Sequence, residues 1–407
     1  MPTYKRRKRI FMNNFYEYNF NIPEYVRTVL DRLHQNGEDA YIVGGSLRDM
    51  LLGVAPHDFD LACSAEPLRT CEIFSDMRVI ETGLSHGTVT VISQGQPIEI
   101  TTFRVDGEYL DMRRPESVSF TRNIEDDLSR RDFTVNAMAF DGKDKLIDLF
   151  CGQDDLNNKI IRTVGNPYER FSEDALRIMR AFRFSAQLGF EIEEKTLAAA
   201  GDLACKLSLI AKERILSEFT RLLCSPYPEK PLKQMRSLGV LAYVLPNYSP
   251  SDEAISLLQT IANLKITDET TRLAAFFSDT DGDNARKELV SLKASRAQRS
   301  VCYVVDALKL DLSLREDYVR LRSKLGLDAK IALRLSVLLN NSPESSLAFI
   351  DDATPCSISE LALSGNDLIA LGYSGREIGK TLARLLDEVI KNPSLNSKEA
   401  LLELLNS

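Results

Sequence analysis

The stretch that decides the fold is a glycine turn followed by an acidic pair: Gly44-Gly45-Ser46-Leu47-Arg48-Asp49, then His57-Asp58-Phe59-Asp60. A short apolar run, 40–43, precedes the glycines, and 46–52 has the pattern of a short helix. Glycines let backbone N–H groups crowd around an anion, and the helix N-terminus adds positive potential. A plain strand-to-helix connection is the more frequent explanation when such glycines stand alone, and their spacing does not support a dinucleotide fold.

The acidic pair, Asp58 and Asp60, makes an anion cradle the better interpretation. Residues 57–63 alternate between polar and apolar side chains, which predicts a strand with both carboxylates on one face. Two such carboxylates repel each other unless cations lie between them, and oxygen ligands suit Mg²⁺. Two Mg²⁺ ions about 3.5–4 Å apart can clamp the attacking and leaving oxygens of a phosphoryl transfer. Glu99, on a strand expected at 97–103, is a third candidate; ordinary surface acids are the open alternative.

Composition excludes several classes of protein and of catalytic site. The chain has 407 residues and a net charge of −8, and no apolar run approaches the ~18 residues of a membrane span. Its three histidines are His34, His57 and His86, so a histidine metal cluster or a Ser-His-Asp triad is excluded from the rest of the chain. Seven cysteines without a C-x-x-C pair indicate buried thiols in a reducing compartment, so we expect a cytoplasmic protein.

Two kinds of periodicity divide the chain. Val-, Ile- and Thr-rich runs up to residue 150 predict strands with intervening helices, and after 165–167 the period becomes helical. We therefore predict an α+β protein with a mixed-sheet head followed by an all-α neck, body and tail. The expected domains are 1–150 (head), 151–226 (neck), 227–284 (body) and 285–407 (tail).

One segment of the tail is strongly basic. Residues 286–336 hold 12 Lys and Arg against 6 Asp and Glu, a local charge of +6 in an acidic chain. Two interpretations are open: a contact surface for a phosphate backbone, or the solvated faces of ordinary helices.

The glycine turn and the acidic pair together resemble the nucleotidyltransferase motif of the DNA polymerase beta superfamily. Further motifs follow in the order found in the family of class II CCA-adding tRNA nucleotidyltransferases and poly(A) polymerases. They are Arg130-Arg131-Asp132-Phe133-Thr134-Val135-Asn136-Ala137, Asp148-Leu149-Phe150-Cys151-Gly152, Glu173-Asp174-Ala175-Leu176-Arg177 with Arg180, and Ala211-Lys212-Glu213-Arg214. The tail segments 361–368 and 375–379 are also similar to that family, with Arg376 where a proline is common.

This resemblance implies an enzyme that adds C, C and A to the 3′ end of tRNA from CTP and ATP, without a nucleic-acid template and with release of pyrophosphate. It implies two Mg²⁺ ions held by Asp58 and Asp60, with Glu99 as a further catalytic candidate. The other implied residues group by role: Gly44, Gly45, Ser46 and Arg48 for the triphosphate; Arg130, Asp132 and Asn136 for ribose and phosphate; Asp174 and Arg177 for the base; and Arg180 for triphosphate or primer.

Base choice is predicted to depend on Asp174 and Arg177. A helix expected over 172–188 would place these residues, three apart, on one face. A carboxylate accepts and a guanidinium donates hydrogen bonds, which matches the amino donor and ring-nitrogen acceptor that cytosine and adenine share. Uracil and guanine present the reverse order. The alternative is an ordinary ion pair on a helix surface.

Two segments bear on the choice among related activities. Residues 104–115 are polar and turn-rich, which fits a surface loop; by resemblance they are the loop that this family needs to switch from C to A addition. Residues 84–89 resemble the tRNA-specific members more than bacterial poly(A) polymerases. The alternatives left open are an A-adding or CC-adding enzyme, a poly(A) polymerase, and a non-catalytic RNA-binding protein on the same scaffold.

Overall fold

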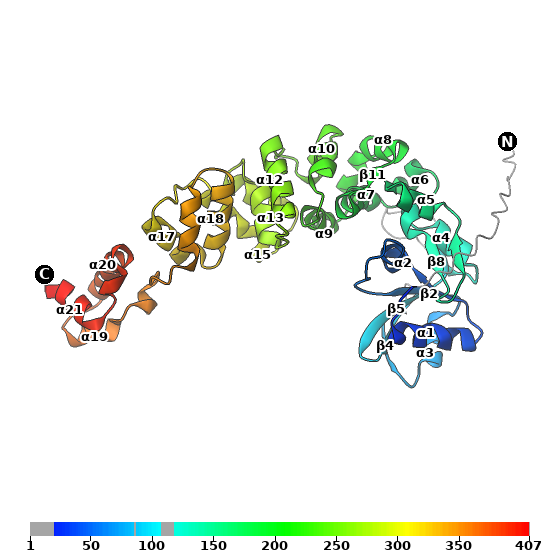
Figure 1. Ribbon diagram of the computed structural model, residues 1–407, viewed down its shortest axis with the longest axis horizontal. Coiled ribbons are helices and arrows are strands. Elements are labelled where there is room, and N and C mark those ends of the chain that lie inside the picture. The colour runs from blue at the N-terminus through cyan, green and yellow to red at the C-terminus, as the bar shows by residue number, and fades with distance from the viewer. Residues whose placement is uncertain (1–19, 85–86, 107–117, 407) are drawn as a thin grey trace. The chain divides into compact units, whose positions relative to one another are not determined.

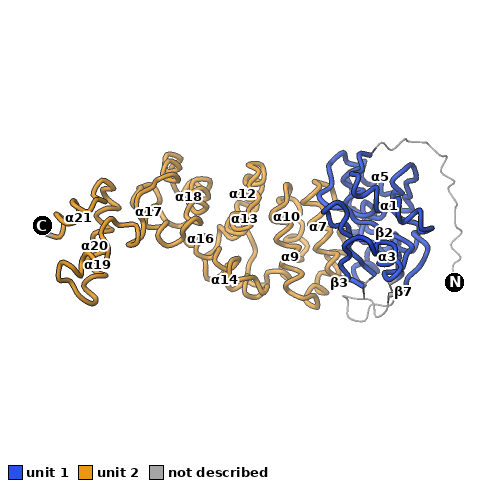
Figure 2. The backbone as a smooth tube through the Cα atoms, turned by 90° about the horizontal axis from the view of Figure 1, so that it is seen from below, with its two compact units in different colours: residues 1–174, 193–196 blue, residues 175–192, 197–407 orange. Residues whose placement is uncertain are grey.

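The computed structural model describes residues 20–84, 87–106 and 118–406. The chain forms two compact units: unit 1 is 1–174 with 193–196, and unit 2 is 175–192 with 197–407 (Figure 2). Unit 1 contains the sheet, and unit 2 is helical (Figure 1). The predicted α+β architecture, a mixed-sheet head followed by helices, is confirmed; the finer domain boundaries at 150, 226 and 284 stay predictions.

A seven-stranded sheet with the order β3-β4-β5-β2-β1-β8-β9 forms the centre of unit 1. β2 and β5 run parallel and the other neighbouring pairs run antiparallel, so the sheet is mixed. Its strands are β1 (Ala40–Val43), β2 (Asp60–Cys63), β3 (Arg78–Gly83), β4 (Thr88–Ser93), β5 (Gln96–Thr102), β8 (Met138–Phe140) and β9 (Leu146–Asp148). A separate antiparallel pair joins β6 (Arg104–Asp106) to β7 (Val118–Phe120).

Helices cover both faces of this sheet because its central strands are apolar on both sides. Tyr41 and Val43 pack with Leu128 of α4 in one cluster, and Ile42, which alternation turns to the opposite face, is also fully buried. The helices of unit 1 are α1 (Glu24–Gln35), α2 (Gly44–Leu51), α3 (Pro67–Ile73), α4 (Ile124–Ser129), α5 (Gly152–Asn157) and α6 (Pro167–Glu173); α8 (Glu194–Asp202) begins in it. The sheet and its helices thus hold the ends of β1 and β2 in place.

Unit 2 is a succession of short amphipathic helices. The α7 helix (Leu176–Leu188) packs on α9 (Lys212–Leu223), and α12 (Asp252–Asn263) packs on α13 (Glu269–Phe276). The remaining helices are α10 (Glu229–Ser237), α11 (Val240–Val244), α14 (Gly282–Ser291), α15 (Arg296–Arg299), α16 (Val301–Ala307), α17 (Arg315–Leu325), α18 (Asp328–Leu338), α19 (Gly365–Ala370), α20 (Arg376–Lys391) and α21 (Lys398–Asn406). Within residues 20–84, 87–106 and 118–406, none of the helices has the length and apolar character needed to cross a membrane.

The shortest elements of the described residues are 3-10 turns and two-residue strands. The 3-10 turns span Thr134–Asn136, Ala204–Leu209, Glu344–Asp351, Ile358–Glu360 and Pro393–Leu395, and the two-residue strands are β10 (Ile160–Ile161) and β11 (Glu191–Ile192).

Candidate active site

The glycine turn joins β1 directly to α2. Val43 is extended, Gly44 has a φ of +68°, and α2 begins at once; the Ser46 hydroxyl donates to the Val43 carbonyl at 2.9 Å. A Cβ on Gly44 would lie 3.4 Å from Arg131 Nη1 and 3.8 Å from Asp60 Oδ2, and one on Gly45 would lie 3.6 Å from Arg48 Nη2. The two glycines therefore leave room for two guanidinium groups and one carboxylate against the backbone.

The acidic pair lies at the start of β2, but only half of it is in the strand. β2 begins at Asp60, so Asp58 precedes the ladder, and the predicted strand over 57–63 is three residues too long at its N-terminus. Asp60 is paired with Val43 of β1 on one side and with Glu99 of β5 on the other. All three acids are exposed at the surface. The sheet register, and not alternation along one strand, is what brings Glu99 beside Asp60.

The negative charges of Asp58 and Glu99 act on Asp60, and such a group of carboxylates favours a cation. The pKa of Asp60 is raised to about 6, first by loss of hydration, then by the charges of Asp58 and Glu99, while Arg131 opposes the shift. Among the described residues, no three His, Cys, Asp or Glu side chains group as a complete metal site. Mg²⁺ is commonly held by only one or two carboxylates, with water and substrate phosphate completing its shell. Asp58 and Asp60 fit that kind of site.

A network behind the turn joins α2 to the second motif. Arg48 is 3% exposed; its Nε and Nη2 donate to Asp49 Oδ1 at 2.9 and 2.7 Å, and its Nη1 donates to Asn136 Oδ1 at 2.9 Å. The Asn136 amide donates in turn to Asp132 Oδ1 at 3.3 Å, which also accepts from the Phe133 N–H at 2.8 Å. The triphosphate role of Arg48 stays a prediction. Its contacts in the structure join α2 to the second motif behind the glycine turn.

Sequence reasoning missed Arg131 and its partner Asp127. Asp127, on α4, is fully buried and forms ion pairs with both Arg130 and Arg131, at 2.6 and 3.0 Å. The signal was available: an aspartate three and four residues before two consecutive arginines reaches both within one helical turn. Arg131, beside Gly44 and Asp60, is therefore a candidate site residue along with the predicted Arg130.

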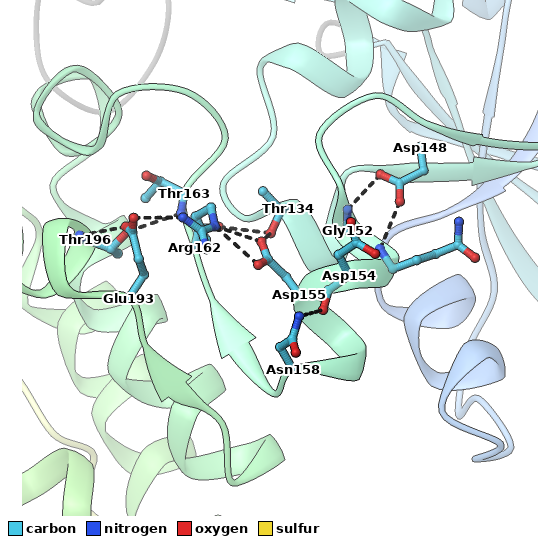
Figure 3. Close-up of polar contacts among 11 residues, drawn as sticks. Thr134, Asp148, Gly152, Asp154, Asp155, Asn158, Arg162, Thr163, Glu193 and Thr196 are labelled. Atoms are coloured by element: carbon cyan, nitrogen blue, oxygen red, sulfur yellow. Dashed lines mark hydrogen bonds and ion pairs between the residues drawn. The ribbon is translucent and has the colours of Figure 1, made fainter. Parts of the chain in front are cut away.

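Polar contacts beneath the second and third motifs fix them to each other (Figure 3). The Thr134 hydroxyl donates to Asp155 Oδ2 at 2.6 Å, and Arg162 bridges Asp155 to Glu193 with contacts of 3.1 and 2.8 Å. A Cβ on Gly152 would lie 2.4 Å from the Thr134 carbonyl oxygen, so only glycine permits this approach. The third motif thus buttresses the second within unit 1.

The Asp148 carboxylate links the two ends of the third motif. It accepts from the backbone N–H groups of Gly152 at 2.7 Å and Gln153 at 2.9 Å (Figure 3). These contacts occupy the first N–H groups of α5, which an N-terminal helix turn leaves without intrahelical partners. Asp148 is therefore an anchor of the motif.

The predicted base-reading helix is interrupted. α6 ends at Glu173 and α7 begins at Leu176, and Asp174 between them is extended, with φ −139° and ψ 103°. Asp174 and Arg177 are therefore not on one face of a single helix, and that part of the prediction is wrong. The base-reading role itself stays a prediction.

Two arginines of α7 pair with one acid of α9. Glu218 pairs with Arg183 and, at 3.7 Å, with Arg180. The Cζ atoms of Arg180 and Arg183 lie 5.2 and 4.0 Å from the ring centroid of Phe184, which is buried. The predicted contact of Arg180 with triphosphate or primer stays a prediction.

The cations of the basic segment 286–336 differ in their contacts. Arg322 donates to the carbonyls of Asp352 and Thr354, Arg315 donates to the carbonyl of Ile390, and Lys293 pairs with Glu213. Several others are exposed, among them Arg286, Lys287, Arg296, Lys309, Lys324 and Arg334. Only part of the local charge is thus directed at solvent.

The loop predicted to switch the site from C to A falls mostly at 107–117, outside the described residues, and so do Ser85 and His86 of the 84–89 segment.

Comparison with known proteins defines the class of enzyme. The head-domain model of poly A polymerase matches 40–162, a model described as "Probable RNA and SrmB- binding site of polymerase A" matches 189–251, and a model of tRNA nucleotidyltransferase domain 2 matches 264–405. The first of these spans the glycine turn, the acidic pair and the second motif. The chain is therefore a nucleotidyltransferase.

Its relatives identify the family. A CCA-adding enzyme of Streptococcus gordonii is 49% identical over 216 residues, which are 53% of this chain and 54% of that protein. One of Pediococcus pentosaceus is 35% identical over 389 residues, 94% of this chain and 97% of that protein. The crystal structure of the Bacillus stearothermophilus CCA-adding enzyme in complex with CTP has a TM-score of 0.78 at 29% identity, covering 95% of this chain and 98% of that one. This chain belongs to the CCA-adding enzyme family.

Proposed function

We propose that this protein adds C, C and A in turn to the 3′ end of tRNA, using CTP and ATP and releasing pyrophosphate. The observation that carries the proposal is the meeting of three groups at one turn: the backbone of Gly44 and Gly45, the guanidinium of Arg131 and the carboxylate of Asp60. A triphosphate needs backbone donors and fixed positive charge, and its reacting phosphorus needs carboxylates for a divalent ion. The similarity to a CTP-bound relative along 95% of the chain supports the choice of substrate.

Each group of the turn has a distinct part in that reaction. Asp58 and Asp60 would hold Mg²⁺, which when bound supplies activation of the primer hydroxyl and compensation of charge on the leaving pyrophosphate. Gly44 and Gly45 bind phosphate oxygens through the backbone. Asn136 and Asp132, fixed to each other at 3.3 Å, orient the ribose, because their partners leave them little rotational freedom.

Selection of C and A is assigned to Asp174 and Arg177. Asp174 caps the C-terminus of α6: its backbone is extended, and its N–H donates to the Arg170 carbonyl at 3.4 Å. An acceptor and a donor that leave a wrong base with unpaired polar groups can reject it by about 10⁴.

The primer is proposed to be the acceptor end of tRNA. The matched tRNA nucleotidyltransferase model covers the basic segment 286–336, whose exposed cations can contact a phosphate backbone.

The deciding experiment supplies purified protein with tRNA lacking its last three nucleotides, and with CTP, ATP, GTP and UTP singly and together. We expect two C additions with CTP alone, and a complete CCA end with CTP and ATP. A product that stops at CC, addition of A only to tRNA already ending in CC, or a long A tail would each replace the proposal by a related activity. Binding of tRNA without any extension would contradict the enzymatic role.

A further inference from the structure

Asp127 lies under the nucleotide site without facing it. It is on α4, its side chain is 0% exposed, and its two carboxylate oxygens serve different arginines. Oδ1 accepts from Arg130 Nε at 3.0 Å and Nη2 at 2.6 Å, and Oδ2 accepts from Arg131 Nε at 3.3 Å and Nη2 at 3.0 Å. Each guanidinium therefore presents one whole edge to the same carboxylate.

We infer that Asp127 is a positioning residue for the nucleotide site, because it divides its two oxygens between Arg130 and Arg131 and so keeps Arg131 on Gly44, beside Asp60. The inference rests on the proposed function, in which that turn receives a nucleoside triphosphate. Asp127 would act through Arg131 and would not touch the substrate itself.

The remaining nitrogen of Arg131 shows how tightly its direction is set. Nη1 donates to the Asn136 carbonyl at 3.4 Å and lies 3.4 Å from where a Gly44 Cβ would be. One carboxylate, one carbonyl and the bare glycine backbone thus restrict the guanidinium from three sides. A guanidinium fixed before the ligand arrives loses little entropy when it binds phosphate.

The charge balance indicates why the carboxylate has to be there. Asp127, Arg130 and Arg131 together carry a net charge of +1, and the buried aspartate itself is fully paired. Without Asp127, Arg131 could pair with Asp60, which lies at the same turn, and an Arg131–Asp60 ion pair would withdraw both groups from the ligand. Asp127 therefore keeps a cation and an anion apart as well as holding the cation.

The test is Asp127→Asn, read first by binding and then by activity. The variant keeps the shape but replaces one acceptor by an amide donor that faces a guanidinium. We expect the Kd for CTP to rise by about 10- to 100-fold, the usual cost of removing a partner that orients a functional group, with the Kd for cytidine unchanged. The KM for CTP should rise in parallel. Asp155→Asn is the matched control, because Asp155 is 5% exposed and paired to Arg162 without contact with Gly44; it should lower Tm and leave the CTP-to-cytidine affinity ratio unchanged.

Arg131→Lys decides the matter where Asp127→Asn does not fold. It leaves the Asp127–Arg130 pair intact but cannot reach both Asp127 and the Asn136 carbonyl, so the Kd for CTP should again rise. In the Arg131→Lys background, Asp127→Asn should raise the Kd for CTP by less than about a further 3-fold, because the effect of Asp127 passes through Arg131. A parent-like Kd for CTP in either single variant, or fully multiplicative effects in the double variant, overturns the inference. A parent protein that neither binds CTP nor extends tRNA overturns the proposed function instead.

Discussion

The glycine turn of unit 1 and the basic segment 286–336 of unit 2 both collect positive charge, but they hold it in opposite ways. At the turn, Arg48 and Arg131 are each fixed by an aspartate and an asparagine and lie against bare glycine backbone. In the segment, Arg286 and Arg296 stand on exposed helix surfaces. Fixed cations at one point suit a ligand of one shape, such as a triphosphate. Exposed, unfixed cations suit a long polyanion whose exact position varies.

At the glycine turn, the largest effect is expected from Asp60→Asn. The change keeps the shape and removes one charged oxygen ligand from the edge of the sheet. Incorporation of both C and A should fall by about three orders of magnitude or more, because the reaction depends on compensation of charge at the phosphate. Single-turnover extension of trimmed tRNA measures it, and the circular dichroism spectrum should match that of the parent. Near-normal addition by the folded variant would refute the assignment of the acidic pair.

A second test asks whether fixed charge also selects the base. Arg177→Ala removes a donor and leaves the acidic pair untouched, so discrimination against UTP and GTP should fall by about 10- to 100-fold, more than the rate with CTP falls. Arg183→Ala is the matched control on the same helix, because both residues are 8% exposed and Arg183 is held by Glu218. If the Arg177 variant rejects UTP as well as the parent does, base reading lies elsewhere.

The third test concerns the unfixed region. Reversal of Arg286, Lys287 and Arg296 to Glu should weaken tRNA affinity by about 10-fold or more at low salt and flatten its salt dependence, because fewer counterions are released. CTP affinity should not change. Reversal of Lys143, Lys145 and Lys195, which are exposed cations of unit 1, gives the same change in net charge as a control. Equal losses from both triple variants would mean that net charge, and not this surface, attracts tRNA.

Local patterns predicted the parts of the site that are local. A strand, two glycines and a short helix follow one another directly, so the turn at Gly44 could be predicted from neighbours alone. The break at Asp174 could not, because helical periodicity continues on both sides of a single extended residue and no glycine or proline marks it. The spacing of Asp127 and Arg131 indicated their ion pair, but it could not place Arg131 beside Gly44, since that depends on α4 packing against β1. Contacts between segments distant in sequence carry no periodic signal.

The basic segment shows the same limit. Its excess of charge was evident from composition, but the guanidinium groups of Arg315 and Arg322 donate hydrogen bonds to backbone carbonyls of other segments. Only the fold determines which cations cap a carbonyl and which ones face solvent.

The smallest predicted effect concerns Asp60 at the glycine turn. It separates the part of Asp60 in ligand binding from its effect on the free energy of unfolding. The pKa of Asp60, about 6, lies above the usual carboxyl value, so its ionised form is disfavoured in the folded protein. Below about pH 4 the group is protonated in both states and costs nothing; the cost grows up to pH 6 and is complete above it. Asp60→Asn should therefore stabilise the metal-free protein at pH 8, by no more than about 1 kcal/mol because the exposed side chain is screened.

Calorimetry in EDTA at pH 4, 6 and 8 measures this difference, which corresponds to a Tm shift of about 2–4 °C. It should vanish at pH 4 and should also shrink when Mg²⁺ is added, because the cation relieves the repulsion in the parent and has a weaker site in the variant. A variant less stable than the parent at pH 8 would mean that Asp60 is a structural partner of Arg131. The Asp60 carboxylate would then hold Arg131 in place, as Asp127 does, and would not face the ligand.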